Sequence, residues 1–358
     1  MGPVTSGGED QRASGLIGHS GAISLLDRSL QSGRLSHAYL LVGPRHVGKM
    51  ALALYLAKAV NCRSEGDRPC DSCPQCRRIA SGQHADVQVI GVPPGEEGGP
   101  GTTRIKIERM RELQRQASFH PYEGTCRVYI IDGAELLSHE AANCLLKTLE
   151  EPPPEVLLLL LTAKEAFVLP TILSRCQRIE LRPMPVQELA RDLAHQLSVE
   201  GEKAGLLARL SGGCPGWAIS AVRDEGVLEG RLNTLERLMG VIEAGLEGRF
   251  SYASELGTLF TKNRRAGQEV LDQWLSWWGD LLLIRAGVGD SVTNAHRRRE
   301  LEQQAQRYPL SAILAFIRSL GEAQSQLEQN ASPRLVLEVL MLKLPAASEL
   351  RPNRPDET

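Results

Sequence analysis

Short apolar runs alternate with amphipathic segments through the first half of the chain. The apolar runs have the length and composition of buried strands and span residues 38–42, 86–92, 127–131 and 156–162. The segments between them show the spacing of amphipathic helices, at residues 22–30, 50–60, 107–118 and 139–151. Nearly continuous apolar strands that alternate with helices indicate a parallel sheet covered by helices on both faces.

The pattern changes at Met184, after which every periodic segment has helical spacing. Three short helices are expected at 186–197, 203–210 and 214–223, and longer helical segments follow from 231 to 344. We therefore predict an α/β domain over residues 15–183, a small helical domain over 184–228 and a larger helical domain over 229–346. Polar tails at 1–14 and 347–358 are expected to be disordered, and the Gly- and Pro-rich residues 93–103 to form a flexible loop.

The composition limits the classes of function. Charged residues are 23% of the chain but nearly cancel to a net charge of −2, which excludes a nucleic-acid binder that is basic overall. Aromatic residues are only 4%, too few for an extended base-stacking surface. The longest apolar run, at 156–161, is too short to cross a bilayer, and the polar N-terminus does not resemble a signal peptide. A soluble, cytoplasmic protein without membrane contact is expected.

Four of the eight cysteines have the spacing of metal ligands. They are Cys62, Cys70, Cys73 and Cys76, and the two CxxC steps are typical of turns that hold a tetrahedral Zn²⁺. Four thiolate ligands leave no position for water, so the metal is expected to be structural rather than catalytic. An iron–sulfur cluster and free thiols are the alternatives. The other cysteines are scattered singly, which favours a reducing compartment over a disulfide framework.

Residues 43–50, Gly-Pro-Arg-His-Val-Gly-Lys-Met, match a phosphate-binding loop except at the last position. In such loops, glycines let backbone N–H groups surround phosphate oxygens, and the lysine reaches the terminal phosphates. Gly43, Gly48 and Lys49 are therefore candidate nucleotide-binding residues. Met50 stands where a hydroxyl would bind Mg²⁺, so ATP or ADP with Mg²⁺ is only weakly supported. The alternative is an ordinary glycine-containing turn between a strand and a helix.

A second candidate for nucleotide chemistry is Asp132, which ends the third apolar run. An aspartate in this position holds Mg²⁺ in phosphate-loop proteins, and hydrolysing enzymes of this kind usually place a glutamate directly after it. Here the next residue is Gly133, and Glu135 is two residues too late to replace that glutamate. Asp132 alternatively caps the turn after the strand. Together with Met50, this pattern allows nucleotide binding but argues against efficient hydrolysis.

Three further segments complete a resemblance to a known family. Ser-His-Ala-Tyr-Leu at 36–40 leads into the loop, Ala-Asn-Cys-Leu-Leu-Lys-Thr-Leu-Glu-Glu-Pro-Pro occupies 142–153, and Leu-Pro-Thr-Ile-Leu-Ser-Arg-Cys occupies 169–176. With the loop and the cysteine cluster, they resemble the bacterial clamp-loader AAA+ subunits of DNA polymerase III. The resemblance covers roughly residues 17–344. The glutamate- and proline-ending segment followed by Ser-Arg-Cys makes it highly specific.

The resemblance assigns roles to the three predicted domains. It implies an AAA+ nucleotide-binding core with a zinc module at 62–76, a helical lid over 184–228 and a helical collar for oligomerisation over 229–346. The active site departs from the motor subunits, gamma and tau, at Met50 and Gly133. The lid segment at 213–218 also lacks the sensor arginine expected there. These departures favour a subunit whose own ATPase activity is absent or weak, within a DNA polymerase holoenzyme.

The same resemblance implies a role in trans for Arg175. In these complexes the Ser-Arg-Cys arginine reaches the ATP held by a neighbouring subunit, where a guanidinium stabilises charge on the transferring phosphoryl group. An arginine that caps a helix C-terminus is the alternative. Thr162, at the end of the fourth apolar run, occupies the sensor-1 position. The implied partners are gamma/tau motor subunits and delta in a hetero-pentamer, which loads the sliding clamp onto primed DNA.

Two rival functions remain open from the sequence. The first is an active motor ATPase that tolerates Met50 and Gly133. The second is a nucleic-acid-binding module in which the zinc knuckle and its flanking arginines contact DNA. The net charge of −2 disfavours the second without partners.

Overall fold

The computed structural model describes residues 16–92 and 104–345. The predicted tails and the predicted loop at 93–103 lie outside these described residues. The chain forms two compact units, of which the first ends at Arg182 and the second begins at Pro183.

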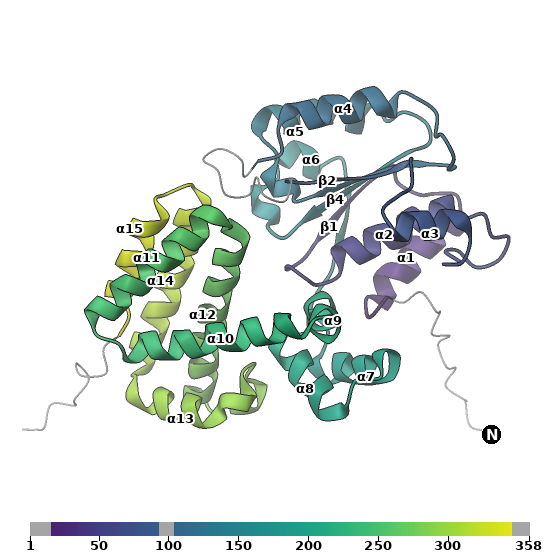
Figure 1. Ribbon diagram of the computed structural model, residues 1–358. Coiled ribbons are helices and arrows are strands. Elements are labelled where there is room, and N and C mark those ends of the chain that lie inside the picture. The colour runs from purple at the N-terminus through teal and green to yellow at the C-terminus, as the bar shows by residue number, and fades with distance from the viewer. Residues whose placement is uncertain (1–15, 93–103, 346–358) are drawn as a thin grey trace, which may run out of the picture. The chain divides into compact units, whose positions relative to one another are not determined.

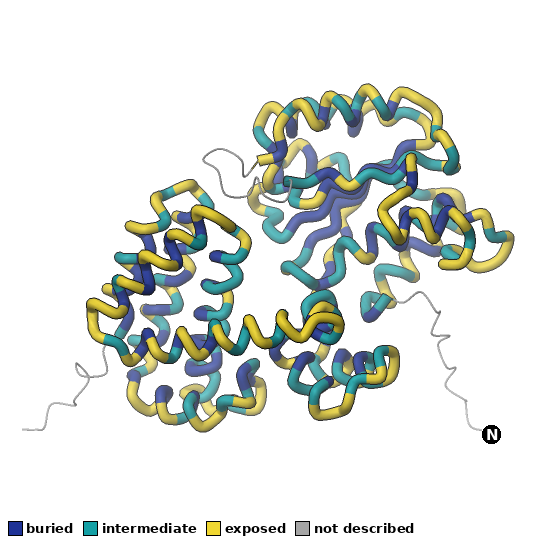
Figure 2. Tube along the Cα trace, in the orientation of Figure 1, coloured by how far each residue is buried: buried dark blue, intermediate teal, exposed yellow. Residues whose placement is uncertain are grey.

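The first unit is built on a five-stranded parallel sheet with the order β2-β3-β4-β1-β5. Its strands are β1 (Ala38–Val42), β2 (Val87–Ile90), β3 (Arg127–Asp132), β4 (Val156–Thr162) and β5 (Gln177–Glu180). Every residue of β1 and β4 is buried, and Figure 2 shows this burial running through the middle of the sheet. The four strands expected from apolar runs are confirmed, and the parallel α/β fold with them.

The fifth strand was not expected from the sequence. β5 reads Gln-Arg-Ile-Glu, and only Ile179 is buried. It lies at the edge of the sheet and pairs with β1 alone, so three of its four side chains face solvent. A short edge strand of this kind lacks the apolar run that identifies a buried strand.

Helices cover both faces of the sheet, with α4 and α5 on one side and α1 and α2 on the other (Figure 1). The helices of this unit are α1 (Ser20–Gln31), α2 (Lys49–Asn61), α3 (Pro74–Ala80), α4 (Ile107–Ala117), α5 (His139–Glu150) and α6 (Pro170–Leu173). The Ser138 side chain caps α5 by accepting a hydrogen bond from the backbone N–H of Ala141. Prolines at 152–154 follow the end of α5, where a helix cannot continue.

The second unit is entirely helical within its described residues. Its helices are α7 (Val186–Leu197), α8 (Gly201–Leu210), α9 (Pro215–Arg223), α10 (Glu225–Glu243), α11 (Leu246–Lys262), α12 (Arg264–Arg285), α13 (Arg298–Arg307), α14 (Leu310–Glu328) and α15 (Pro333–Leu342). Residue 228, the predicted boundary between two helical domains, falls inside α10. Gly226 and Gly230 are part of this continuous helix rather than breaks in it. The division into two helical domains therefore stays a prediction.

The core of the second unit is centred on three tryptophans of α12. Trp274, Trp277 and Trp278 are fully buried, and the ring of Trp278 lies 4.6 Å from that of Phe316 between centroids. The indole N–H of Trp277 donates to Gln304, so this polar group is satisfied inside the core. Among the described residues, no helix is both long enough and apolar enough to span a bilayer.

Candidate functional site

The phosphate loop, Asp132 and Thr162 meet at the carboxyl ends of the strands. Val42 of β1 is in register with Thr162 of β4, and Asp132 of β3 with Leu161 of β4. The backbone N–H of Gly43 donates to the Thr162 carbonyl over 3.2 Å. The carboxyl ends of adjacent parallel strands are where α/β proteins place their ligands. The structure thus brings together the loop, Asp132 and Thr162.

The loop itself has a backbone that requires glycine. A Cβ atom at Gly43 would lie 2.3 Å from the Leu181 carbonyl oxygen, and Gly48 has a φ of +114°. The Lys49 ammonium folds over the loop and donates to the carbonyls of Gly43 (2.6 Å) and Pro44 (2.7 Å). Met50 follows in the first turn of α2 and offers no hydroxyl. The loop can therefore present backbone N–H groups and an ammonium to phosphate, but not the usual Mg²⁺ ligand.

His19 contacts this loop, although nothing in its sequence spacing indicated a role. It precedes α1 with a left-handed φ of 61°, and its Nε2 donates to the Val47 carbonyl over 2.6 Å. Its ring also lies 3.3 Å from the position of a Cβ on Gly48. His19 therefore fixes the second half of the loop from outside the motif.

Asp132 and its neighbours show why the second acidic position is incomplete. Asp132 is exposed at the end of β3, and Gly133 follows with a φ of +87°. A Cβ atom at Gly133 would come within 2.9 Å of Leu136 Cδ1. The turn at Ala134–Leu136 returns Glu135 toward β4, where its Oε1 accepts from the backbone N–H of Ala163 over 3.2 Å.

Glu135 thus lies beside the end of β4, closer to Thr162 than its place in the sequence indicated. Its second carboxylate oxygen is buried and has no hydrogen-bond partner in the described part of the chain. Thr162 is buried as well, and its hydroxyl oxygen accepts from the backbone N–H of Lys164 over 3.0 Å. Both side chains therefore fix the end of β4.

Arg175 lies in the turn between α6 and β5, and the chain itself holds its guanidinium. Its Nη2 forms an ion pair with Glu150 at 2.7 Å, and its Nη1 donates to the Thr171 carbonyl and the Ser174 hydroxyl. Its side chain keeps about a third of its surface exposed, at 35%. Burial raises the pKa of the next residue, Cys176, to about 12. Its thiol therefore stays protonated at neutral pH and packs in the interior rather than acting as a nucleophile.

Arg175 lies near the amino ends of the strands, whereas the nucleotide loop lies at their carboxyl ends. Gln177, which begins β5, is in register with Tyr39 near the start of β1, whereas Gly43 follows the end of β1. The four positions from Tyr39 to Gly43 correspond to about 13 Å along the strand. Arg175 precedes β5 by two residues and pairs with Glu150, which ends α5 before the start of β4. The guanidinium is therefore placed away from the nucleotide site of its own chain.

The four clustered cysteines come together as predicted. Their sulfur atoms all lie within 4.8 Å of one another, and the group can hold a metal ion. Cys62 ends α2, Cys73 caps α3, and Cys76 lies in the first turn of α3. Backbone N–H groups donate to three of the sulfurs, for example from Cys73 to Cys70 over 3.3 Å.

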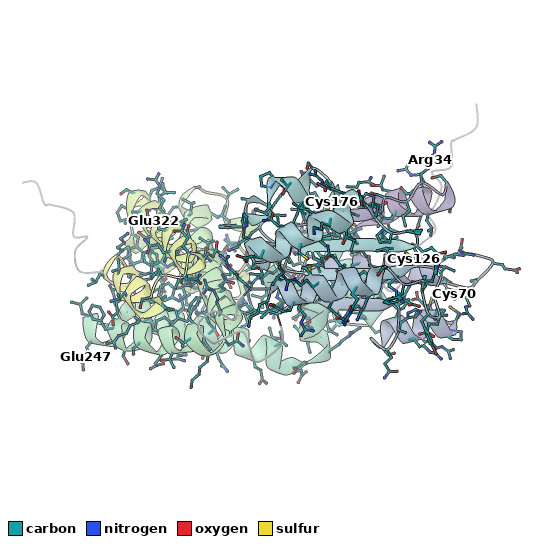
Figure 3. The ribbon with its side chains drawn as sticks, turned by 90° about the horizontal axis from the view of Figure 1, so that it is seen from above. Arg34, Cys70, Cys126, Cys176, Glu247 and Glu322 are labelled. Atoms are coloured by element: carbon teal, nitrogen blue, oxygen red, sulfur yellow. The ribbon has the colours of Figure 1, made fainter. Side chains whose placement is uncertain are left out.

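Helix α3 was not predicted beside this cluster, because the cysteine spacing indicated only turns. The sulfur separations fit a tetrahedral ion, since metal–sulfur bonds of about 2.3 Å imply sulfurs about 3.8 Å apart. Hydrogen bonding to Ser72 lowers the pKa of Cys70 to about 6, whereas burial raises the pKa of Cys62 and Cys76. Buried thiols converging on one point suit a cation that stabilises them as thiolates. Figure 3 shows Cys70 well separated from Cys176, the neighbour of Arg175.

A buried carboxylate joins the cysteine module to the sheet. Asp86, which directly precedes β2, is 1% exposed and accepts three backbone hydrogen bonds of 2.8 Å, from Tyr122, Glu123 and Gly124. The carbonyl of Glu123 in turn accepts from Arg63 and Gln75 of the module. Two of the arginines that flank the cysteine cluster, Arg63 and Arg78, are thus used in contacts with Glu123.

Comparisons with known proteins agree with this geometry. The family model described as "DNA polymerase III, delta subunit" matches residues 18–185, and the one for its C-terminal part matches residues 232–345. The DNA polymerase III subunit delta' of Bacillus subtilis is 30% identical over 322 residues, which are 90% of this chain and 94% of that protein. The chain belongs to the delta-prime family of DNA polymerase III subunits.

Tau subunits of DNA polymerase III are also similar to this delta-prime family member. The tau subunit of Bacillus subtilis is 28% identical over 93% of this chain, which spans 61% of that protein. The tau subunit of Escherichia coli is 37% identical over 52% of this chain and 28% of its own length. The chain spans 94% of the delta' subunit of Bacillus subtilis but only 61% of its tau subunit, which agrees with a clamp-loader subunit of the delta-prime type.

Solved structures include similar chains at low identity. A gamma subunit-related protein of Thermotoga maritima has a TM-score of 0.40 and 22% identity, with 90% of this chain and 98% of that chain covered. The Holliday junction branch migration motor RuvB of the same organism has a TM-score of 0.39 and 18% identity, covering 68% and 76%. In this delta-prime-type chain, the parallel sheet with its loop after β1 and the helical C-terminal unit are the α/β and all-helical parts that the sequence predicts.

Proposed function

We propose that this subunit acts in the clamp loader chiefly through Arg175, which it offers to ATP bound by a neighbouring motor subunit. The observation that carries the proposal is the position of Arg175 just before β5, near the amino ends of the strands. The chain's own nucleotide loop lies at their carboxyl ends. A guanidinium placed there serves a nucleotide on another subunit better than one on its own. It would donate hydrogen bonds to phosphoryl oxygens as negative charge develops on them.

The chain's own nucleotide site supports the passive half of this proposal. The glycines and Lys49 are suited to binding phosphate, and Thr162 and Asp132 lie at the same edge. Met50 supplies no Mg²⁺ ligand, and Gly133 supplies no carboxylate to polarise water. ATP or ADP bound here would be held with little turnover.

The proposed partners follow from the family. Gamma/tau motor subunits and delta would join this chain in a hetero-pentamer that loads the sliding clamp onto primed DNA in the cytoplasm. Residues 229–346 would form the oligomerising collar and residues 184–228 the lid. The four clustered cysteines would bind Zn²⁺, which would stabilise the module by crosslinking α2 to α3.

A motor ATPase is the second candidate, and the similarity to tau subunits favours it. ATP turnover by the purified chain, with and without DNA, distinguishes the two, with Lys49→Ala as the control for contaminating ATPases. The proposal predicts no turnover that depends on Lys49. Turnover that Lys49→Ala abolishes would show that Met50 and Gly133 are tolerated, and the motor function would replace the passive one.

A further inference from the structure

Glu150 fixes one end of the Arg175 guanidinium. It is the last residue of α5, and its Oε1 lies 2.7 Å from Nη2 of Arg175. The other terminal nitrogen, Nη1, donates to the Thr171 carbonyl at 3.0 Å and the Ser174 hydroxyl at 3.1 Å. The guanidinium is therefore held at both terminal nitrogens while its side chain remains 35% exposed.

Helix stability does not account for a glutamate at this position. The C-terminus of a helix carries partial negative charge, so a carboxylate there is unfavourable without a cation beside it. The Glu150 side chain is also 49% exposed, and an ion pair so accessible to water contributes little to folding. What the pair does achieve is orientation, because it restricts a long side chain that otherwise samples many rotamers.

We propose that Glu150 is the positioning residue for Arg175. It holds the guanidinium ready at the surface, so that engaging the neighbour's phosphates costs less side-chain entropy. This inference rests on the proposed function of Arg175. Without Glu150, Arg175 would still be present but would spend less time in the orientation that the neighbouring nucleotide requires.

The chain provides a matched control for Glu150 in the next residue. Glu151 has the same charge, is exposed and follows the same helix. Within the described ranges, its side chain takes part in no hydrogen bond or ion pair. Glu151→Ala therefore removes the same charge from the same surface without touching Arg175.

The test measures kcat and KM for ATP in the clamp-loader complex reconstituted from the full chain, motor subunits and delta. Glu150→Ala is expected to lower kcat about three- to fivefold, the rate equivalent of a surface ion pair, with KM unchanged. Glu150→Gln keeps a hydrogen-bond acceptor and should recover part of the loss, while Glu151→Ala should match the unmodified complex. Size-exclusion chromatography of each complex verifies that assembly is intact.

A double variant separates positioning from any other effect of Glu150. In the Arg175→Ala background, Glu150→Ala should change kcat no further, because the residue it positions is gone. An equal loss in both backgrounds, or a rise in kcat with Glu150→Ala, would overturn the inference. If Arg175→Ala lowers kcat and Glu150→Ala does not, the positioning role alone fails. If Arg175→Ala has no effect, the proposed function of Arg175 fails first.

Discussion

Replacement of Asp86 by alanine is expected to destabilise the α/β unit selectively. Asp86 is the buried acceptor that holds the loop carrying Tyr122, Glu123 and Gly124 against the start of β2. Arg127 lies 3.4 Å from the same carboxylate and adds a favourable charge. Alanine would leave three backbone donors and one guanidinium without this acceptor.

The geometry sets the size of the effect. Each lost hydrogen bond costs about 1 kcal/mol, because water can reach these half-buried donors, which gives a total of about 3 kcal/mol. With a urea dependence of about 2 kcal/mol per molar, the midpoint of unfolding would fall by about 1.5 M. Asp67, an exposed aspartate of the same unit, provides the control, and Asp67→Ala should change stability by less than about 0.5 kcal/mol.

The distribution of tryptophan makes the assay specific to each unit. All four tryptophans, Trp217, Trp274, Trp277 and Trp278, lie in the second unit. Tryptophan fluorescence therefore follows unfolding of the helical unit, while circular dichroism follows both units. Asp86→Ala should lower the midpoint of the circular dichroism transition and leave the fluorescence transition in place.

The pH dependence gives a second check on the same carboxylate. Backbone hydrogen bonds outweigh the effect of burial and lower the pKa of Asp86 from its ordinary value of 3.8. Because the pKa of Asp86 is lower in the folded state than in the unfolded state, its stabilisation is complete above the unfolded-state pKa. It is lost as pH falls through the folded-state pKa. A circular dichroism midpoint that is the same in Asp86→Ala and the unmodified chain at neutral pH would refute the reasoning.

Three further predictions concern the site and the cysteines. Removal of metal from the cysteine cluster with a chelator should lower the thermal midpoint seen by circular dichroism but not the one seen by tryptophan fluorescence; an unchanged midpoint would show that the cluster is not a structural metal site. Gly133→Glu should lower the free energy of unfolding by about 1–2 kcal/mol, because position 133 has a positive φ and a Cβ there would contact Leu136. The variant should show no ATP turnover. A gain of turnover would contradict the view that this turn cannot hold a catalytic glutamate. Burial raises the pKa of Cys126 and Cys176 to about 12, so both thiols should react slowly with iodoacetamide at pH 8 and faster as pH rises. In urea both should react quickly, and mass spectrometry can measure the rates. Equal rates with and without urea would be inconsistent with this burial.

The sheet could be predicted from the sequence because its central strands are continuous apolar runs. β4 contains six apolar residues in succession, and a parallel strand buried on both faces requires such a run. β5 escaped the same reasoning because one face of an edge strand is solvated and its sequence is mostly polar. Helix α3 was missed because its 7 residues are too few to show a helical period, and the cysteine spacing around it indicated turns.

The residues of the candidate site could be predicted in part, because motif spacing marks the groups that touch a ligand. Gly43, Lys49 and Arg175 belong to such motifs. The residues that hold them are not marked in this way: His19 lies outside these motifs, and Glu150 lies in the segment at 142–153, whose spacing does not indicate a contact with Arg175. His19 and Glu150 act through contacts between segments 28 and 25 positions apart, which only the fold creates. Glu135 follows Asp132 at a spacing that is too long for a catalytic glutamate. That spacing along the chain does not reveal the turn that returns its side chain to the end of β4.

The most direct test compares Arg175→Ala with Lys49→Ala of this subunit in the same reconstituted clamp-loader complex, with ATP hydrolysis as the readout. Arg175→Ala should lower the hydrolysis rate of the complex, because a neighbouring site loses its trans-acting guanidinium. Lys49→Ala should leave the rate close to that of the unmodified complex, because the subunit's own site turns over little ATP. The reverse pattern, a loss with Lys49→Ala and none with Arg175→Ala, would contradict the account.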